Sequence, residues 1–274
     1  MTAEPTSVDA PLKLQIADEI RIKIERGDLR PGDSVATLQE LAEEWRCSIT
    51  TARDAVDLLK QQGLITGGRG GRAKVREQPR RRMRDSARHQ AEKDLVLAPE
   101  EIRAKHGEAE DDIGELLERL QFRTDYSIIP ANEALAAVFS RPVGEPLLRK
   151  EYETSTKRGT RLAYSVAFVP KQLLEGNPAL LSSDCEPWPG GGQHQFHTVG
   201  IEIARMDDEV TAVAPTTVDM KRWALEPGVC MLHVRRIAID TQGRVVEISD
   251  AQYPADRTAL RFSTPLAPLK PWKD

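Results

Sequence analysis

Apolar residues recur at helical spacing in three successive stretches at the start of the chain. In the first, positions 12, 16, 20 and 24 share one face of a helix that begins near Pro11 and ends at Gly27. In the second, Thr37 and Glu40 have the spacing of a capping box, in which each side chain bonds to the other residue's backbone amide. In the third, Ser48 can cap a helix whose apolar positions 52, 55, 56 and 59 face inward. The pattern therefore predicts three short helices before residue 63.

Two short apolar runs and a basic, glycine-rich loop follow the third helix. That helix stops at Gly63, a residue suited to a left-handed C-terminal cap. Residues 64–66 and 73–75 have the composition of two strands, and the loop between them reads Gly-Gly-Arg-Gly-Gly-Arg. Helix, turn, helix and a basic wing predict a module that reads duplex DNA, with the first turns of the third helix at base edges and phosphates. The alternative is two amphipathic helices with solvated polar faces, which does not explain the wing.

Residues 11–75 resemble the winged helix-turn-helix domain of the GntR family of bacterial transcription regulators. The matching segments are Ile16-Ala17, Ile20-Arg21, Gly27-Asp28-Leu29-Arg30-Pro31-Gly32-Asp33, Leu41-Ala42, Ser48-x-Thr50-Thr51-x-Arg53 and Leu58-Leu59-x-x-x-Gly63-Leu64-Ile65. Relatives often carry arginine where this chain has Gln39 and Ile49, so its operator is expected to differ from the usual family site. The residues expected to contact DNA are Thr37, Gln39, Ser48, Ile49, Thr50, Thr51, Arg53, Arg69, Gly70 and Arg72.

The second half of the chain contains an internal repeat. Glycines at 144 and 159 and a proline at 170 are separated by 15 and 11 residues, and the same three residue types recur 84 residues later. Each repeat predicts a strand, a short helix and two strands joined by a hairpin. The expected strands are 122–129, 147–156, 161–169, 209–214, 229–240 and 244–253, with helices at 133–139 and 219–225. Two such units predict one antiparallel sheet of about six strands with helices over one face.

Residues 119–262 resemble the effector-sensing UTRA domain of the HutC subfamily of GntR regulators, whose fold is like that of chorismate lyase. The resemblance is carried by Gly159-x5-Ser165-x4-Pro170 and by Gly243-Arg244-Val245-Val246-Glu247-x5-Tyr253-Pro254-Ala255-Asp256-Arg257. It implies that a small ligand binds between the two repeats and alters how paired DNA-binding domains are held. The positions that the resemblance assigns to the effector are Glu153, Ser155, Ser165, Glu247 and Tyr253.

Two of these positions bear on the charge of the effector. Glu153 and Ser155 stand where sugar-phosphate sensors of the family use an Arg-x-Arg pair. Guanidinium groups attract a phosphate, whereas a carboxylate repels it. The sequence therefore predicts an effector that is not a sugar phosphate and is neutral or cationic. The alternative for Glu153 and Glu247 is a solvent-facing charge on a half-exposed strand.

Charge is distributed unevenly along the chain. The formal net charge is −4, but residues 60–90 contain ten lysines and arginines against two acidic residues. A basic block beside the wing fits a DNA-facing end that is separate from a second function. Two interpretations of residues 80–89 remain open: a solvated linker, or an extension that follows phosphates next to the wing.

Composition and spacing argue against several other classes of protein. No run approaches the roughly 18 apolar residues of a membrane span, and no signal peptide is visible. Three distant cysteines predict neither a disulfide framework nor a metal site. The histidines lack metal-site spacing, and Ser165 and Ser249 lack a nucleophile elbow. The glycines at 190–192 are expected in a flexible loop with His194 and His197. The sequence thus predicts no catalytic residues, cofactor or metal.

Together these patterns predict an α+β protein that regulates transcription. The expected organisation is a mobile arm at 1–10, a DNA-binding domain at 11–76, a basic then helical linker at 77–118, a UTRA-like effector-binding and dimerisation domain at 119–266 and a tail at 267–274. We expect a cytoplasmic, homodimeric, one-component repressor that binds double-stranded operator DNA and a small-molecule effector. Rival hypotheses are a ligand-binding or scaffold protein with a vestigial winged helix, and a lyase-like enzyme.

Overall fold

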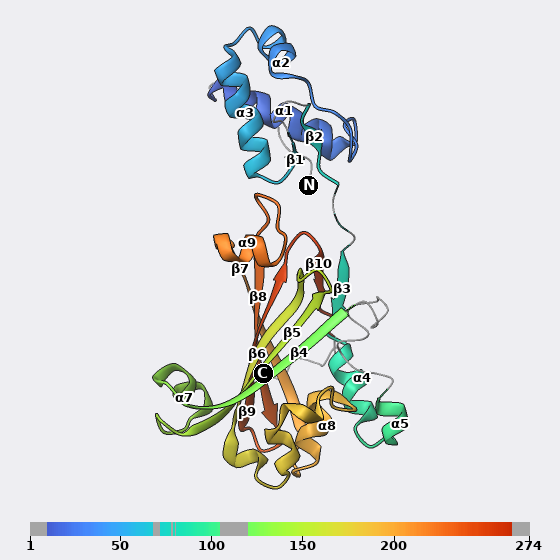
Figure 1. Ribbon diagram of the computed structural model, residues 1–274, viewed down its shortest axis with the longest axis vertical. Coiled ribbons are helices and arrows are strands. Elements are labelled where there is room, and N and C mark those ends of the chain that lie inside the picture. Colours follow the sequence, from blue (N-terminus) through green and yellow to red (C-terminus); the bar gives the residue numbers. More distant parts are fainter. Residues whose placement is uncertain (1–9, 68–71, 78, 80, 105–119, 265–274) are drawn as a thin grey trace, which may run out of the picture. The chain divides into compact units, whose positions relative to one another are not determined.

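A computed structural model describes residues 10–67, 72–77, 79, 81–104 and 120–264 of the chain (Figure 1). Their contacts divide the chain into two compact units. The first comprises the residues up to Arg80 together with Ala214–Cys230, and the second comprises Arg81–Val213 and the residues from Met231 onward. Residues 1–9 of the predicted arm, wing residues Arg69 and Gly70, and the predicted tail lie outside the described ranges.

The first unit is built on three helices and a two-stranded sheet. Helices α1 (Leu12–Arg26), α2 (Leu38–Glu44) and α3 (Ile49–Gln61) precede strands β1 (Ile65–Thr66) and β2 (Lys74–Val75), which pair antiparallel. These bounds confirm the predicted helices and wing strands. The unit also includes helix α9 (Thr217–Arg222).

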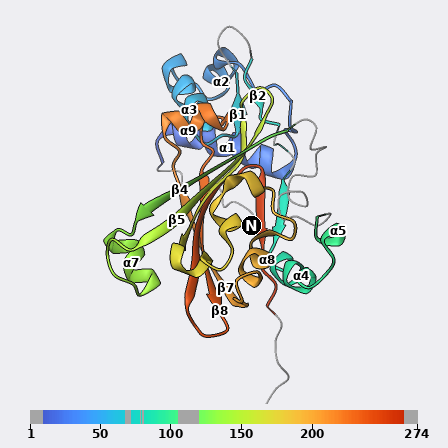
Figure 2. The same cartoon turned by 60° about the horizontal axis from the view of Figure 1, so that its bottom comes forward.

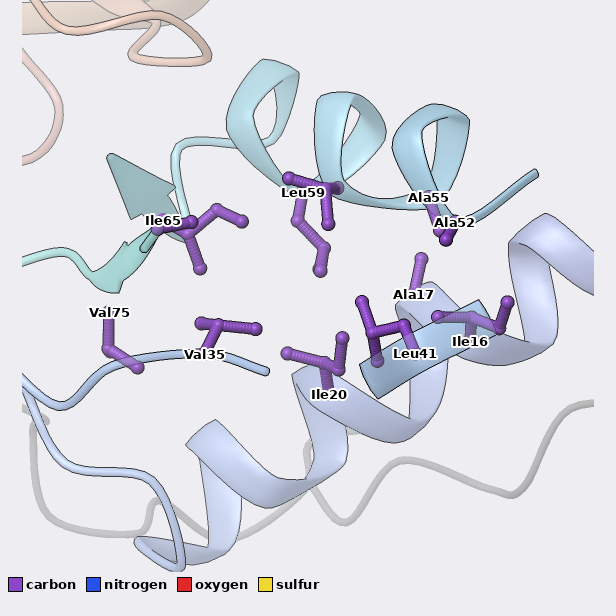
Figure 3. Close-up of a cluster of buried hydrophobic side chains, with 12 residues drawn as sticks. Ile16, Ala17, Ile20, Val35, Leu41, Ala52, Ala55, Leu59, Ile65 and Val75 are labelled. Carbon is purple, nitrogen blue, oxygen red and sulfur yellow. The ribbon is translucent and has the colours of Figure 1, made fainter. Parts of the chain in front are cut away.

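One apolar core joins helices α1, α2 and α3 to the wing strands. Ile16 and Ile20 of α1 point toward Leu41 of α2 and Leu59 of α3 (Figure 3). Val35 belongs to the same core and also extends the small sheet, because its amide donates to Ala73 O at 2.8 Å. The sequence did not predict this third edge. It fixes the base of the wing to the segment that leads into α2.

The second unit contains a six-stranded antiparallel sheet. Its strands are β4 (Leu120–Pro130), β5 (Pro146–Thr156), β6 (Arg161–Pro170), β7 (Ile203–Val213), β8 (Met231–Asp240) and β9 (Val245–Pro254). The order is β4-β5-β6-β9-β8-β7, so the two predicted repeats meet where β6 pairs with β9. The four repeated glycines all have φ between +79° and +86°, the left-handed region that favours glycine in such turns. The repeat and the sheet are therefore confirmed.

Helices cover both faces of this sheet, so the prediction of helices over one face was wrong. Leu147 and Leu148 are consecutive on β5 and almost fully buried, at 0% and 1% exposure. Consecutive strand residues point to opposite faces. Leu147 packs with Phe139 of α7 (Glu133–Phe139), whereas Leu148 packs with the short helices η2 (Lys171–Leu174) and η3 (Pro178–Leu181) and with Phe196 of α8 (Gly191–His197). We call the second side the α8 face.

The segment expected to be a linker contributes regular elements to the second unit. Strand β3 (Arg82–Asp85) pairs parallel with β10 (Thr258–Arg261), a strand that the sequence did not predict. Helix α4 (Arg88–Leu95) then lies beside α8 (Figure 2). Helix α5 (Glu100–Arg103) begins after Pro99 within the predicted linker, residues 105–119 are outside the described ranges, and Leu120 already belongs to β4.

The glycines at 190–192 were predicted to lie in a flexible loop, but two of them belong to a helix. Gly191 and Gly192 begin α8, which also carries His194 and His197. Glu92 of α4 accepts a hydrogen bond from the Gln193 amide at 2.9 Å. A carboxylate is stabilised by the unpaired amides at the start of a helix. This contact explains why the glycine-rich segment is helical here.

Candidate functional site

The first candidate surface is the exposed side of α3. Ala52 and Ala55 on the opposite side are fully buried, which orients the helix on the core. Ile49, Thr50 and Arg53 are exposed, with Ile49 at 47% of its maximal area. A hydrophobic residue is costly to leave in water, so Ile49 stands out among the polar residues of this turn. The structure thus brings three of the predicted DNA-contacting residues onto one accessible face.

Ser48 and Thr51 are engaged with each other at the start of α3. The Thr51 amide donates to Ser48 Oγ at 3.1 Å, and the two hydroxyl oxygens are 2.9 Å apart. Ser48 is therefore the N-cap of the helix, as predicted. This geometry shows that both hydroxyls stabilise the helix start, a role distinct from the DNA contact expected of them.

Thr37 and Glu40 form the predicted capping box at the start of α2. The Glu40 amide donates to Thr37 Oγ1 at 3.2 Å, and the Thr37 amide donates to Glu40 Oε2 at 2.7 Å. Gln39, between them, is exposed. The other carboxylate oxygen of Glu40 accepts from Arg72 Nη2 at 2.5 Å. The hydrogen bonds with Thr37, followed by the charge of Arg72, lower the pKa of Glu40. The wing residue Arg72 is thus held against α2.

The second candidate site is a cavity of about 110 Å³ on the α8 face of the sheet. Its floor lies where the two repeats meet, and its other walls come from the β3–α4 segment and from Leu260 and Phe262. The lining residues are Arg84, Asp85, Ser86, Arg88, His89, Ser165, Asp208, Val234, Arg236, Ser249, Ala251, Tyr253, Leu260 and Phe262. A second cavity of about 330 Å³ shares Ser86, His89, Asp208 and Phe262 with it and continues alongside α4.

The predicted effector-binding residues divide into two groups. Ser165 and Tyr253 line the cavity. Glu153 does not, because Tyr152 pairs with Ser165 across β5 and β6, and the residue after Tyr152 points to the other face. Glu153 instead accepts a hydrogen bond from the buried Arg161. Glu153 therefore lies outside this cavity, and its predicted contact with the effector remains a prediction.

Ser155 and Glu247 are also absent from the cavity lining. Ser155 is 4% exposed and follows a register shift in the β5–β6 pairing. Such an irregularity redirects side chains relative to a regular strand, so counting back from the hairpin does not predict the side of the sheet. Glu247 lies opposite Ala238, on the α8 face but beyond the cavity.

A half-buried ion pair, which the sequence did not predict, forms one wall of the cavity. Arg236 donates from Nε and Nη2 to the two carboxylate oxygens of Asp208, at 2.8 and 3.0 Å. Burial acts to raise the pKa of Asp208, but the hydrogen bonds and charge of Arg236, with smaller effects of His89 and Arg88, lower it overall. Arg88 and His89 belong to the basic run at residues 80–89, which the sequence had already indicated as a candidate for an anion contact. Nothing local in the sequence indicates that Asp208 lies opposite them.

A buried polar network lies farther along the α8 face. Lys150 is 2% exposed and donates to Gln195 Oε1 at 2.5 Å, and Gln195 donates to Glu186 Oε1 at 2.8 Å. The hydroxyl of Tyr152 donates to the same glutamate oxygen at 3.0 Å. Burial lowers the pKa of Lys150, and the charges of Glu247 and Glu186 partly offset this effect. The network joins the sheet to α8 through polar side chains.

Two features are absent from the described ranges: a membrane-spanning helix and a cluster of metal-ligating side chains. No helix there combines the length and apolar content needed to cross a membrane. The same residues contain no group of three or more histidine, cysteine or acidic side chains placed to hold a metal ion.

Two family models match successive parts of the chain. The model described as bacterial regulatory proteins of the GntR family matches residues 12–75, and the model of the UTRA domain matches residues 124–259. The chain belongs to the GntR family. A UTRA domain behind the GntR domain fits the HutC subfamily. This GntR regulator is therefore a DNA-binding transcription regulator that responds to a ligand.

Individual relatives agree with this assignment. An uncharacterized HTH-type transcriptional regulator of Rhizobium meliloti is 26% identical over 253 residues, covering 91% of this chain and 93% of that protein. The mannosyl-D-glycerate transport/metabolism system repressor MngR of Escherichia coli is 40% identical over 68 residues, covering 25% of this chain and 28% of that protein. A crystal structure of a GntR-family transcriptional regulator has a TM-score of 0.69 and 21% identity, covering 94% of this chain and 99% of that one. That likeness shows a shared fold.

Proposed function

We propose that the exposed side of α3, together with the wing, reads the operator of this regulator. The observation that carries the proposal is the division of α3 into a buried side at Ala52 and Ala55 and an exposed side at Thr50 and Arg53. A recognition helix presents residues of its N-terminal turns to the major groove. Arg53 would contact a base or a phosphate. Ile49 offers apolar contact, for which the thymine methyl group is a suitable partner.

The remaining predicted residues are proposed to act around this helix. Gln39 extends the reading surface from α2, and Ser48 and Thr51 hold the start of α3. On the wing, Arg69, Gly70 and Arg72 would meet the adjacent backbone or minor groove. Arg72 must exchange Glu40 for phosphate when DNA binds.

We further propose a homodimer that is switched by an effector in the cavity between the repeats. Two-fold symmetry would place two α3 helices in successive major grooves of a roughly palindromic operator. Ser165 and Tyr253 would contact the effector, and Glu247 would act indirectly through its charge on Lys150. Such a switch needs differential affinity for the DNA-competent and DNA-incompetent dimers, typically about 1–3 kcal/mol.

We also propose that the protein represses transcription, acts in the cytoplasm and has no catalytic role. Repression is supported by the similarity of 68 residues of this chain to the repressor MngR, and a cytoplasmic location is part of the same proposal. A role without catalysis is supported by the family assignment. The relation of the UTRA fold to a lyase is a likeness of fold, which does not by itself imply chemistry.

The test is fluorescence anisotropy of the full-length protein with duplex DNA from upstream of its own gene and with a scrambled duplex. At about 150 mM salt, the upstream duplex should bind roughly a thousand-fold or more tightly than the scrambled one. Equal, weak binding to both duplexes and to the flanking genes' upstream regions would instead support the vestigial winged helix.

A further inference from the structure

Two glycines at the start of α8 lie against side chains of the segment that precedes the sheet along the chain. Gly190 and Gly191 have φ of +94° and +67°, in the left-handed region that favours glycine. A Cβ on Gly191 would lie 2.6 Å from Glu92 Oε1, and a Cβ on Gly190 would lie 2.8 Å from Arg103 Cδ. A Cβ on Gly192 would meet no heavy atom of the described residues within 4 Å. The first two glycines therefore allow close contact with α4 and α5, whereas the third does not.

Glu92 and Gln193 join α4 to α8 by two reciprocal hydrogen bonds. Glu92 Oε1 of α4 accepts from the Gln193 amide at 2.9 Å, and Gln193 Nε2 of α8 donates to His89 O at 2.7 Å. Gln193 is 6% exposed, so breaking its bond to His89 would leave a buried amide group without that partner, which is costly. We call these two bonds, together with Gly191 against Glu92, the α4–α8 clasp.

Further contacts fasten the elements on either side of the clasp. Before α4, β3 pairs with β10. Within α4, Lys93 Nζ donates to Ile203 O of β7 at 2.7 Å. After α4, Arg103 of α5 lies against Gly190 and donates from Nε to Pro189 O at 3.4 Å. The segment from β3 to α5 is therefore attached to the second unit at several points, although its sequence predicts a linker.

Strand β3, the first element after the wing along the chain, depends on this support. It belongs to a two-stranded sheet with β10, and such a sheet has little stability by itself. Only Ser86 and Ala87 separate β3 from α4. Contacts that hold α4 on α8 therefore also restrain β3.

A restrained connection matters for a protein that contacts DNA at two places. In a dimer, the second DNA-binding domain binds at an effective concentration that is set by the length and stiffness of the connection. A looser connection spreads this domain over more positions and lowers that concentration. Restraint thus contributes affinity for two half-sites without any new contact to DNA.

We propose that Glu92 and Gly191 are positioning residues for operator binding: the α4–α8 clasp holds β3 and thereby limits how widely the DNA-binding domain that precedes it can move. The inference rests on the proposed homodimer and its two-part operator. Loosening the clasp should weaken the binding of two half-sites together and leave the binding of a single half-site unchanged.

The test measures two affinities of the full-length protein by fluorescence anisotropy. One duplex carries the operator segment that footprinting locates upstream of the gene, and in the other duplex one half-site of that segment is scrambled. Glu92→Ala should weaken binding of the first duplex about tenfold or more and leave binding of the second within about twofold of wild type. Gly191→Ala should act in the same direction, because the added Cβ displaces Glu92 from the Gln193 amide.

Two variants and a second measurement separate the clasp from general damage. Gly192→Ala is the matched control, because a Cβ there has open space among the described residues, and it should bind both duplexes like wild type. Glu92→Gln keeps an oxygen that can accept from the Gln193 amide, so it should lose less affinity for the first duplex than Glu92→Ala. Hydrogen exchange of Glu92→Ala should be faster than wild type at the α4 amides and unchanged at the α3 amides, as expected for a local loosening.

Four results would overturn the inference. They are an equal loss of affinity for both duplexes, unchanged binding of the first duplex in Glu92→Ala and Gly191→Ala, a loss in Gly192→Ala as large as in Gly191→Ala, and α4 exchange in Glu92→Ala as slow as in wild type. Wild-type protein that binds the first duplex no more tightly than the second would reject the proposed dimer on its operator and this inference with it. A wild-type preference for the first duplex that persists in Glu92→Ala and Gly191→Ala would reject the role of the clasp alone.

Discussion

Replacing Ser48 by alanine should destabilise α3 without removing a direct DNA contact. Ser48 Oγ accepts from the Thr51 amide at 3.1 Å and lies 2.9 Å from Thr51 Oγ1. The substitution leaves that amide at the start of α3 without its capping partner, at an exposed position where water can replace it. Loss of a serine N-cap costs about 1 kcal/mol, within a range of about 0.5–2 kcal/mol. Because solvent is accessible, we expect a value near the middle of that range.

The same position offers a control that separates capping from DNA contact. Aspartate is as good an N-cap as serine, and its charge is favourable at a helix start. Ser48→Asp should therefore keep the stability of α3 within about 0.5 kcal/mol of wild type. The added negative charge would lie beside the DNA backbone, so operator affinity should fall about tenfold or more. Ser48→Ala should show the reverse. Its α3 should be less stable than in wild type, whereas its operator affinity, measured well below the unfolding temperature, should stay close to wild type.

Native-state hydrogen exchange of the α3 amides measures the stability, and fluorescence anisotropy at fixed salt measures operator affinity. Exchange resolves this unit from the rest of the chain, since local and global openings are reported amide by amide. Unchanged α3 protection in Ser48→Ala, or a large loss of operator affinity in that variant with protection intact, would refute the capping role.

Three further changes probe the operator surface and the buried network. Arg53→Ala should weaken operator binding by about 1–3 kcal/mol, with the exposed Arg26→Ala on α1 as control; an unchanged dissociation constant would remove Arg53 from the reading surface. Glu40→Gln keeps a capping-box acceptor but frees Arg72 from its ion pair. Operator affinity should therefore rise a few-fold in anisotropy titrations. Equal or weaker binding would contradict the proposal that Arg72 leaves Glu40 to bind phosphate. Burial lowers the pKa of Lys150 in the folded state below its usual 10.5. At pH values between the folded and the unfolded pKa, the folded state therefore binds fewer protons than the unfolded state. Lys150 makes the free energy of unfolding rise with pH in that window. Lys150→Met should flatten this alkaline rise in urea unfolding midpoints relative to wild type, and identical slopes would show that Lys150 does not titrate there.

The sequence alone determined the parts of this protein that depend on neighbouring residues. Capping boxes, helix stripes and hairpin glycines act within a few residues, so the caps at Thr37 and Ser48 and the turn at Gly159 follow from local spacing. The internal repeat also indicated that the last two strands of each half pair with each other, because a short hairpin joins them. The resemblance to known regulators added the DNA-binding and ligand-sensing functions, and the family comparisons support both.

Tertiary structure alone decided the composition of the cavity. Arg84 reaches the cavity because β3 pairs with β10, in a register that places Arg82 opposite Thr258. These two strands are far apart in the sequence, and no local pattern specifies a partner at such a separation. Asp208 and Arg236 meet because β7 and β8 pair, and the register of β5 turns Glu153 away from the α8 face. A shift of one residue in register moves a side chain to the other face of a sheet. The charges that line the cavity were therefore set by long-range strand pairing, which sequence spacing near one hairpin could not reveal.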